Sequence, residues 1–358
     1  MILRLWPGTT QEDVAALRAM LEREALRTFL SPETARPIVA VVDEVPAALA
    51  RDLAAHSAVE QIVHPEGEWR LVDRSYREEH SVVNVGAVRF GGGEVVVIAG
   101  PCSVEGADFM QETAGRVRAA GAHVLRGGAF KPRTSPYSFQ GFGREGLRQL
   151  KDAGDAFGMP VVSEIMDAAQ VDTFRDFDVD CLQVGARNMQ NFTLLKAIAR
   201  AGKPVLLKRG LSATVKEWLG AAEYLAAYGC PDVILCERGI RTFETATRNT
   251  LDLTVLPLLR EWTHLPVVVD PSHAAGIPSL IPPLSRAAIA AGADGVAVEV
   301  HPRPEEARSD GAQALLPGEL ARVVADARVI AAAIGRRFHP GPRRAVQRTT
   351  SGLGERTA

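Results

Sequence analysis

Polar or reactive residues stand at the ends of eight short apolar runs in this chain. They include one thiol, one imidazole, two carboxylates and four cations, which are ligands for a metal ion and binding groups for anions. The runs end at or carry Cys102, Arg126, Glu164, Arg187, Lys208, Arg238, His273 and Glu299. These residue types predict one site that combines metal binding with recognition of phosphate or carboxylate groups.

A candidate metal set consists of Cys102, His273, Glu299 and Asp310. Three of them end apolar runs, and Asp310 lies in a long loop after the last run, where active-site loops are common. A thiolate, an imidazole and two carboxylates suit Mn²⁺, Fe²⁺, Co²⁺ or Zn²⁺ without selecting strongly among them. Singly, each residue also has a structural explanation, such as core packing for Cys102 or an ion pair for Glu299.

The segment 127–141, with the sequence GGAFKPRTSPYSFQG, is too rich in Gly, Pro and Ser to form a helix. Its paired glycines allow the backbone to approach a ligand closely. Arg133 offers a planar fork for phosphate, with hydroxyls beside it from Thr134 and Ser135. The alternative is a structural turn with solvated charges, but the whole run favours phosphate binding.

A cluster of cations is expected where the runs end, formed by Arg126, Lys131, Arg187, Lys208 and Arg238. Like charges that converge repel one another unless an anion binds between them, so a substrate with both carboxylate and phosphate groups would suit them. Glu164, Glu237 and Asp270 are available as neutralising partners. We expect these three to orient the cations and metal ligands from the second layer of the site.

Helix-like stretches separate the eight runs, and this alternation predicts a (β/α)8 TIM barrel over 94–335. The chain has 358 residues, more than the roughly 250 of one barrel, which leaves room for a small extra domain. Residues 1–75 read as β-α-β-β-α-β, a small ferredoxin-like domain. We expect 76–93 to be a linker and barrel-floor hairpin, and 336–358 to be a mobile basic tail.

Composition excludes several classes of protein. The 41 basic and 43 acidic residues give a net charge of −2, which offers no bulk attraction to nucleic acid or membrane surfaces. No apolar run reaches the roughly 20 residues of a membrane helix, and no signal peptide opens the chain. Four cysteines without CxxC spacing favour a reducing, cytoplasmic location.

Seven segments resemble the 3-deoxy-D-arabino-heptulosonate 7-phosphate (DAHP) synthase family. The resemblance is to the compact microbial subtype that carries an N-terminal ferredoxin-like regulatory domain. The segments follow the family's order and span the whole predicted barrel. They are AGPCSVE, LRGGAFKPRTSPYSFQG, QVGARNMQNF, PVLLKRG, LCERGIRTFETATRNTLD, VDPSHAAG and VEVHPRPEEARSDGAQ.

The resemblance implies roles for residues that the patterns single out. The family's metal ligands map onto Cys102, His273, Glu299 and Asp310. Its phosphoenolpyruvate pocket maps onto Arg126, Lys131, Arg187, Lys208 and Arg238, and its erythrose 4-phosphate contacts map onto Arg133, Thr134 and Ser135.

The implied reaction opens the shikimate pathway to chorismate and the aromatic amino acids. A divalent metal would polarise the aldehyde of erythrose 4-phosphate while carbon 3 of phosphoenolpyruvate attacks it. Lys131 or a metal-bound water would protonate the new alkoxide, with Cys102 and His273 completing the catalytic set. The subtype further implies a homo-oligomer, with a tetramer favoured, and allosteric control by tyrosine or phenylalanine.

Other functions remain open on the sequence. The nearest is 3-deoxy-D-manno-octulosonate 8-phosphate synthase, although the Lys-Pro-Arg-Thr-Ser string favours the four-carbon acceptor. A Schiff-base aldolase would use Lys208 or Lys131. A catalytically silent barrel that senses aromatic metabolites is the alternative outside enzymes. A chorismate mutase domain at the N-terminus is disfavoured by the alternating strands, because that domain is all-helical.

Overall fold

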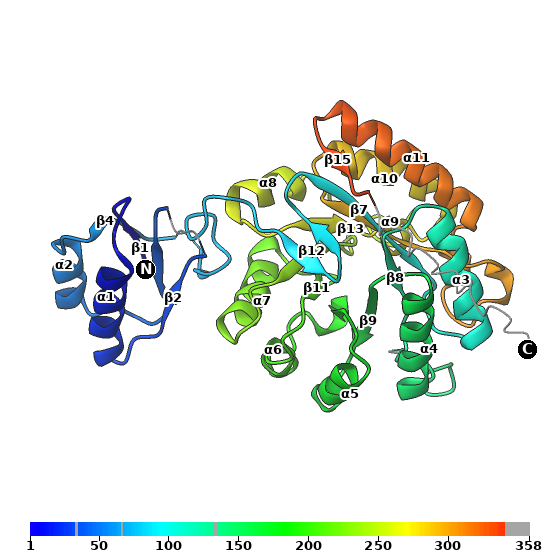
Figure 1. The fold of residues 1–358 in the computed structure, drawn as a ribbon. Coiled ribbons are helices and arrows are strands. Elements are labelled where there is room, and N and C mark those ends of the chain that lie inside the picture. Colours follow the sequence, from blue (N-terminus) through cyan, green and yellow to red (C-terminus); the bar gives the residue numbers. More distant parts are fainter. Residues whose placement is uncertain (33–34, 66, 132–134, 341–358) are drawn as a thin grey trace, which may run out of the picture.

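The computed structural model describes residues 1–358 apart from 33–34, 66, 132–134 and 341–358 (Figure 1). Its N-terminal part holds a four-stranded sheet in the order β2-β3-β1-β4, antiparallel throughout. The chain order is β1 (Ile2–Leu5), α1 (Gln11–Arg23), β2 (Thr28–Leu30), β3 (Ile38–Val41), α2 (Ala47–Ala54) and β4 (Val59–Val63). Figure 1 shows this part in blue, beside the larger body of the chain.

The expected closed barrel is confirmed. Eight parallel strands pair in sequence, and the last returns to pair with the first. The strands are β7 (Glu94–Gly100), β8 (Val124–Arg126), β9 (Val161–Ile165), β10 (Cys181–Val184), β11 (Val205–Lys208), β12 (Val233–Glu237), β13 (Val267–Val269) and β14 (Gly295–Glu299).

Helices surround this barrel in the outer layer (Figure 1). They are α3 (Ala107–Ala119), α4 (Gly143–Ala156), α5 (Val171–Asp176), α6 (Phe192–Ala199), α7 (Val215–Ala227), α8 (Val255–Trp262), α10 (Ile281–Ala290) and α11 (Pro317–Ala333). The short helix α9 (Pro271–Ala275) directly follows the carboxyl end of the seventh barrel strand. Short 3-10 turns are η1 (Ala168–Gln170), η2 (Ala186–Asn188), η3 (Pro278–Leu280), η4 (Pro304–Glu306) and η5 (Gly311–Gln313). Among the described residues, no helix is long and apolar enough to cross a membrane.

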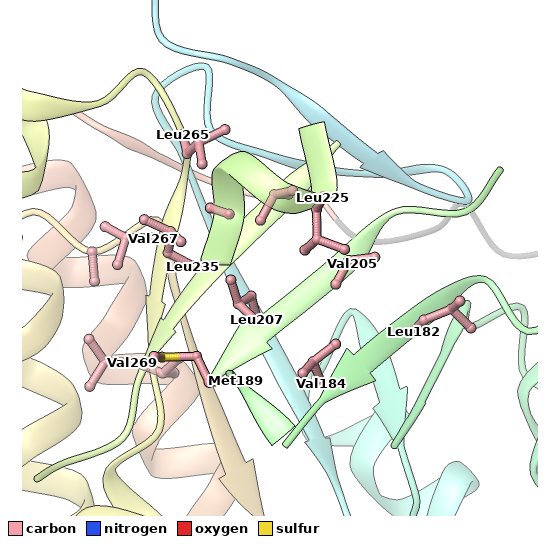
Figure 2. Packing of buried hydrophobic residues seen from close by; sticks show 14 of the residues in the cluster. Leu182, Val184, Met189, Val205, Leu207, Leu225, Leu235, Leu265, Val267 and Val269 are labelled. Carbon is pink, nitrogen blue, oxygen red and sulfur yellow. The ribbon is translucent and has the colours of Figure 1, made fainter. Parts of the chain in front are cut away.

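Two apolar layers hold the barrel together. In the outer layer, strand residues such as Val184, Leu207 and Val269 pack with Leu225 of α7 (Figure 2). In the inner layer, the hairpin β5 (Val83–Val85) and β6 (Val88–Phe90) shares one buried cluster with the alternate strand residues. The strand residues in that cluster include Val124, Val162, Leu206, Cys236 and Val268.

The inner layer explains how the site is positioned. Residues two apart on a strand share a face. Arg126 follows Val124 by two residues, Lys208 follows Leu206, and Arg238 follows Cys236. The strands therefore carry an apolar floor at one end of the barrel and inward-facing cations at the other.

The predicted mobile tail is wrong in its first residues. β15 (Arg337–Phe338) pairs in parallel with β7, and the next residue is also held, because His339 Nδ1 lies 2.6 Å from Glu94 Oε2. Residues 341–358, the rest of the predicted tail, lie outside the described residues.

Candidate active site

One cavity at the carboxyl ends of the strands brings together most of the residues that the sequence singles out. Its lining includes all five cations of the predicted cluster, together with three of the predicted carboxylate and imidazole groups. These residues are Arg126, Lys131, Arg187, Lys208, Arg238, Glu164, His273 and Asp310. The barrel thus gathers side chains that are up to 184 positions apart in sequence, from Arg126 to Asp310.

The candidate metal ligands meet at the edge of this cavity. Ligand atoms of Cys102, Glu299 and Asp310 all lie within 4.8 Å of one another. Cys102 Sγ donates to Asp310 Oδ2 at 3.1 Å, and His273 Nε2 lies 3.3 Å from Glu299 Oε1. The donor set of thiol, imidazole and two carboxylates fits a divalent transition metal.

Asp270 orients the imidazole of His273. It is the N-cap of α9 and accepts the His273 backbone N–H at 2.9 Å, while its Oδ2 lies 2.7 Å from His273 Nδ1. A proton on Nδ1 leaves the lone pair of Nε2 facing Glu299, as a metal ligand requires. Burial lowers the pKa of His273, which favours this neutral form. The sequence placed His273 at a strand end, whereas it lies within α9, four residues beyond β13.

Glu299 is fully buried at the end of β14 and has three polar neighbours. Arg126 Nη2 donates to it at 3.0 Å, Gln313 Nε2 donates to its other oxygen, and His273 faces it. Burial alone would raise the pKa of Glu299, but His273 and Arg126 lower it below the ordinary value. The lowered pKa favours the charged carboxylate of Glu299, which is the form that binds a metal cation.

Lys208 and Asp270 form a buried ion pair, with Nζ 2.6 Å from Oδ2. Burial alone would raise the pKa of Asp270, but His273 and Lys208 hold it well below its ordinary value. Asp270 thus contacts one predicted substrate cation and one predicted metal ligand at the same time.

Two arginines of the cluster keep unused donors. Arg126 is buried, and its Nη1 has no hydrogen-bond partner in the described part of the chain. Arg187 lies in η2 at the rim, exposed, with no carboxylate within ion-pair distance among the described residues. A buried donor without a partner is costly unless a ligand satisfies it. These guanidinium groups mark where an anion would bind.

Glu164 and Glu237 differ in position. Glu164 lines the cavity, and its Oε1 lies so close to Gly185 that an added Cβ there would be 2.0 Å away. Glu237 does not line the cavity: its Oε2 pairs with Arg209 Nη1 at 2.9 Å, and its Oε1 accepts the Gly239 N–H at 2.6 Å. Glu237 therefore orients Arg209, a buried arginine that the sequence analysis missed.

The predicted acceptor contacts are only partly described. Arg133 and Thr134 lie outside the described residues, and Ser135 lies half-buried, with its hydroxyl accepting the Tyr137 N–H at 3.3 Å. The cavity also has polar lining residues that the sequence analysis did not single out, namely Gln183, Arg241, Arg248 and Asn249. Three of these four fall within the LCERGIRTFETATRNTLD segment, whose density of arginine was the available signal.

The fold and the site together define a (β/α)8-barrel enzyme that acts on phosphorylated, anionic substrates. Residues 74–329 match the DAHP synthetase I family. The chain is 47% identical over 315 residues to phospho-2-dehydro-3-deoxyheptonate aldolase of Thermotoga maritima, covering 88% of this chain and 93% of that one. It belongs to the DAHP synthetase I family.

Solved structures agree with this assignment. The crystal structure of phospho-2-dehydro-3-deoxyheptonate aldolase (DAHP synthase) from Thermotoga maritima has a TM-score of 0.75 at 44% identity, covering 94% of this chain and 99% of that chain. A truncated form of the Thermotoga maritima synthase has a TM-score of 0.72 and covers 76% of this chain.

The predicted reaction is confirmed over its nearest alternative. The 2-dehydro-3-deoxyphosphooctonate aldolase of Nitrobacter hamburgensis is 33% identical over 64% of this chain. The activity of this chain is therefore the condensation of phosphoenolpyruvate with erythrose 4-phosphate, which yields DAHP and phosphate.

Proposed function

We propose that the cavity performs this condensation as a metal-dependent site, with Cys102, His273, Glu299 and Asp310 holding one divalent ion. The observation that carries the proposal is the convergence of these donors beside a cavity lined by the five cations of the predicted cluster. When bound, the ion supplies Lewis-acid polarisation of the acceptor aldehyde.

The cations would hold phosphoenolpyruvate between the barrel strands. Arg126, Lys131, Arg187, Lys208 and Arg238 surround the cavity from different strands and loops. Such a cage aligns carbon 3 of phosphoenolpyruvate with the aldehyde and stabilises charge during attack. Arg133, Thr134 and Ser135 would hold the phosphate of erythrose 4-phosphate.

Lys131 is the proposed proton donor. As carbon 3 forms its bond to the aldehyde carbon, the aldehyde oxygen takes a proton from Lys131 Nζ. Water then adds to carbon 2, and phosphate leaves with the electrons of the cleaved C–O bond. Burial alone would lower the pKa of Lys131, but Cys102 and Glu164 raise it above the ordinary value, so the group stays charged until the alkoxide forms.

We further propose that the four-stranded N-terminal sheet with its two helices is a ferredoxin-like regulatory domain. Its strand order and β-α-β-β-α-β sequence support this assignment. Tyrosine and phenylalanine are the proposed effectors, bound between such domains of neighbouring subunits in a homo-tetramer. Trp69 stacks on Trp262, and Leu71 and Val72 share the core of the barrel, so the domain would end before Gly67 and not at 75.

The joint between the two parts offers a route for regulation. Glu223 on α7 accepts the backbone N–H groups of Leu71 and Val72 at 2.8 and 3.0 Å. The same helix follows the loop that begins at Lys208. A movement of the linker at Leu71 and Val72 would thus shift α7, and with it the loop that connects α7 to Lys208. We place the enzyme in the cytoplasm, in line with its four unpaired cysteines.

A phosphate-release assay tests the proposed site chemistry. Metal-free protein is supplied with phosphoenolpyruvate, one acceptor sugar and one metal at a time. We expect release only when a divalent transition metal is present, and faster with erythrose 4-phosphate than with arabinose 5-phosphate. Full activity in metal-free protein would refute the metal dependence.

A further inference from the structure

Arg308 connects two loops of the active site through its guanidinium group. Its Cζ lies 4.0 Å from the ring centroid of Phe139 and 5.5 Å from that of Phe142. Arg308 follows β14, whereas both phenylalanines follow β8. Within the described ranges, no carboxylate lies within ion-pair distance of Arg308, so the rings are its side-chain partners. Cation–π contacts of this kind attract even at exposed positions.

The loop of Arg308 carries a candidate metal ligand. The Arg308 backbone N–H donates to Glu105 Oε1 at 2.9 Å. One residue further, Ser309 Oγ lies 3.0 Å from Cys102 Sγ. Asp310 follows with a φ of 52°, a left-handed conformation that is uncommon for a non-glycine residue. Because Arg308 and Asp310 are only two residues apart, a shift of the backbone at Arg308 would also displace the Asp310 carboxylate.

The loop of the phenylalanines carries Lys131 and the acceptor residues. The backbone N–H of Lys131 donates to Gln140 O at 2.9 Å, and that of Gly143 donates to Ala129 O at 2.9 Å. These bonds tie the two ends of the loop together beside Phe139. The Phe139 and Phe142 rings also meet edge to face, with centroids 5.3 Å apart. The position of this ring pair is thus fixed together with the backbone of Lys131.

We propose that Arg308 is a positioning residue that holds the loop of Phe139 and Phe142, which follows β8, against its own loop, which follows β14 and carries Asp310. It does not line the cavity, so it would act through Asp310 on one side and through the loop 129–143 on the other. The inference rests on the proposed roles of these two loops. It predicts that loss of the Arg308 contact weakens erythrose 4-phosphate and metal binding more than phosphoenolpyruvate binding, because Lys131 alone of the five proposed phosphoenolpyruvate cations lies on this loop.

The test compares Arg308→Ala and Arg308→Lys with the wild type. Kinetics give the KM of each substrate, and calorimetry gives Mn²⁺ affinity in the absence of substrates. For Arg308→Ala we expect the KM for erythrose 4-phosphate to rise roughly threefold to tenfold and Mn²⁺ affinity to fall roughly twofold to fivefold. The KM for phosphoenolpyruvate should stay within about twofold of the wild type. Arg308→Lys should recover part of both losses, because lysine also binds aromatic faces.

A variant that lacks both phenylalanine rings separates loss of the Arg308 contact from a general loss of stability. In a Phe139→Leu/Phe142→Leu protein, Arg308→Ala should cause little further loss, because its partners are already gone. Arg322→Ala on the exposed face of α11 is the matched control and should change neither constant. Equal losses in both backgrounds, equal rises in both KM values, or unchanged Mn²⁺ affinity would overturn the inference. The calorimetry needs no turnover, so it tests the role of Arg308 separately from catalysis. Failure of the wild type in the phosphate-release assay would refute the proposed function and not the role of Arg308.

Discussion

Lys131 Nζ lies 3.0 Å from Cys102 Sγ and donates to the Cys102 carbonyl oxygen at 2.9 Å. The proposed proton donor and a candidate metal ligand are therefore in direct contact, although one belongs to the loop after β8 and the other to the loop after β7. Burial raises the pKa of Cys102 to about 12, although the charge of Lys131 opposes part of this rise. The contact brings a proton source next to the place where the aldehyde oxygen would be held.

Lys131→Met should leave a folded protein with little turnover. Loss of general acid catalysis costs roughly 100-fold to 10,000-fold in rate, and we expect kcat to fall within that range. Steady-state phosphate release measures it, with Lys216→Met on the exposed start of α7 as the control. A kcat within about threefold of the wild type would assign the proton to another donor.

Metal removal should abolish activity reversibly. Treatment with EDTA followed by gel filtration should stop turnover, and Mn²⁺ should restore it, because ligand atoms of Cys102, Glu299 and Asp310 lie within 4.8 Å of one another and His273 contacts Glu299. Cys102→Ala should lose Mn²⁺ binding in calorimetry as well as activity. Cys230→Ala, a buried cysteine far from the mouth, is the control. Turnover by metal-free Cys102→Ala protein would contradict the assigned ligand set.

The two substrates should respond to different arginines. Arg187→Ala should raise the KM for phosphoenolpyruvate and Arg133→Ala the KM for erythrose 4-phosphate. If the proposed roles hold, each change removes a charge-assisted contact worth roughly 1.5–3 kcal/mol, which corresponds to roughly a 10- to 100-fold effect. Initial rates with each substrate varied in turn provide the measurement. If Arg133→Ala acted mainly on phosphoenolpyruvate, the proposed division of the cations would be wrong.

Acid should destabilise the joint beneath the barrel through His264. Its Nε2 lies 2.8 Å from Leu71 O, and its Nδ1 lies 2.7 Å from Ser81 Oγ. Burial lowers the pKa of His264 to about 4, against roughly 6.5 in an unfolded chain. The unfolded state therefore binds the proton first as pH falls. The stabilisation is complete above about pH 6.5 and is lost towards pH 4, by at most about 3 kcal/mol.

Urea unfolding at several pH values checks this prediction. His264→Gln should show a smaller loss of unfolding free energy between pH 7 and pH 4.5 than the wild type. The slope that remains would come from groups such as His123, whose pKa is also lowered by burial, to about 3. His64→Gln at an exposed position is the control. Identical slopes for the wild type and His264→Gln would show that this imidazole is not the responsible group.

Removal of residues 1–65 should leave an active enzyme that no longer responds to aromatic amino acids. This cut keeps Trp69, Leu71 and Val72 on the barrel, whereas removal of 1–75 would expose their buried partners. Kinetics with and without tyrosine and phenylalanine, on both full-length and shortened protein, test the prediction. A coupling of 1–3 kcal/mol, roughly 5- to 150-fold, is the usual scale of such control. Equal inhibition of both proteins would place the effector site in the barrel.

The sequence was most informative where local pattern and chemistry coincide. Apolar runs ending in Arg126, Lys208 or Glu299 predicted both the strands and the residues at their ends. Side chains alternate along a strand, so the residue two positions after an inward-facing apolar residue also faces the barrel interior, at the carboxyl end of the strand. The sequence was less informative where partners are chosen across the fold. Glu237 was expected to orient the substrate cations, but it faces away from the cavity and pairs with Arg209.

The sequence alone thus determined the barrel, the family and the identity of most cavity-lining residues, since these depend on residue types in chain order. Only the tertiary structure decided that Asp270 serves both His273 and Lys208, and that Arg308 reaches Phe139 across two loops. It also paired Arg337–Phe338 with β7, where a free tail was expected. These contacts join residues that are far apart in the chain, and their geometry is set by closure of the barrel and not by any local preference of the segments involved.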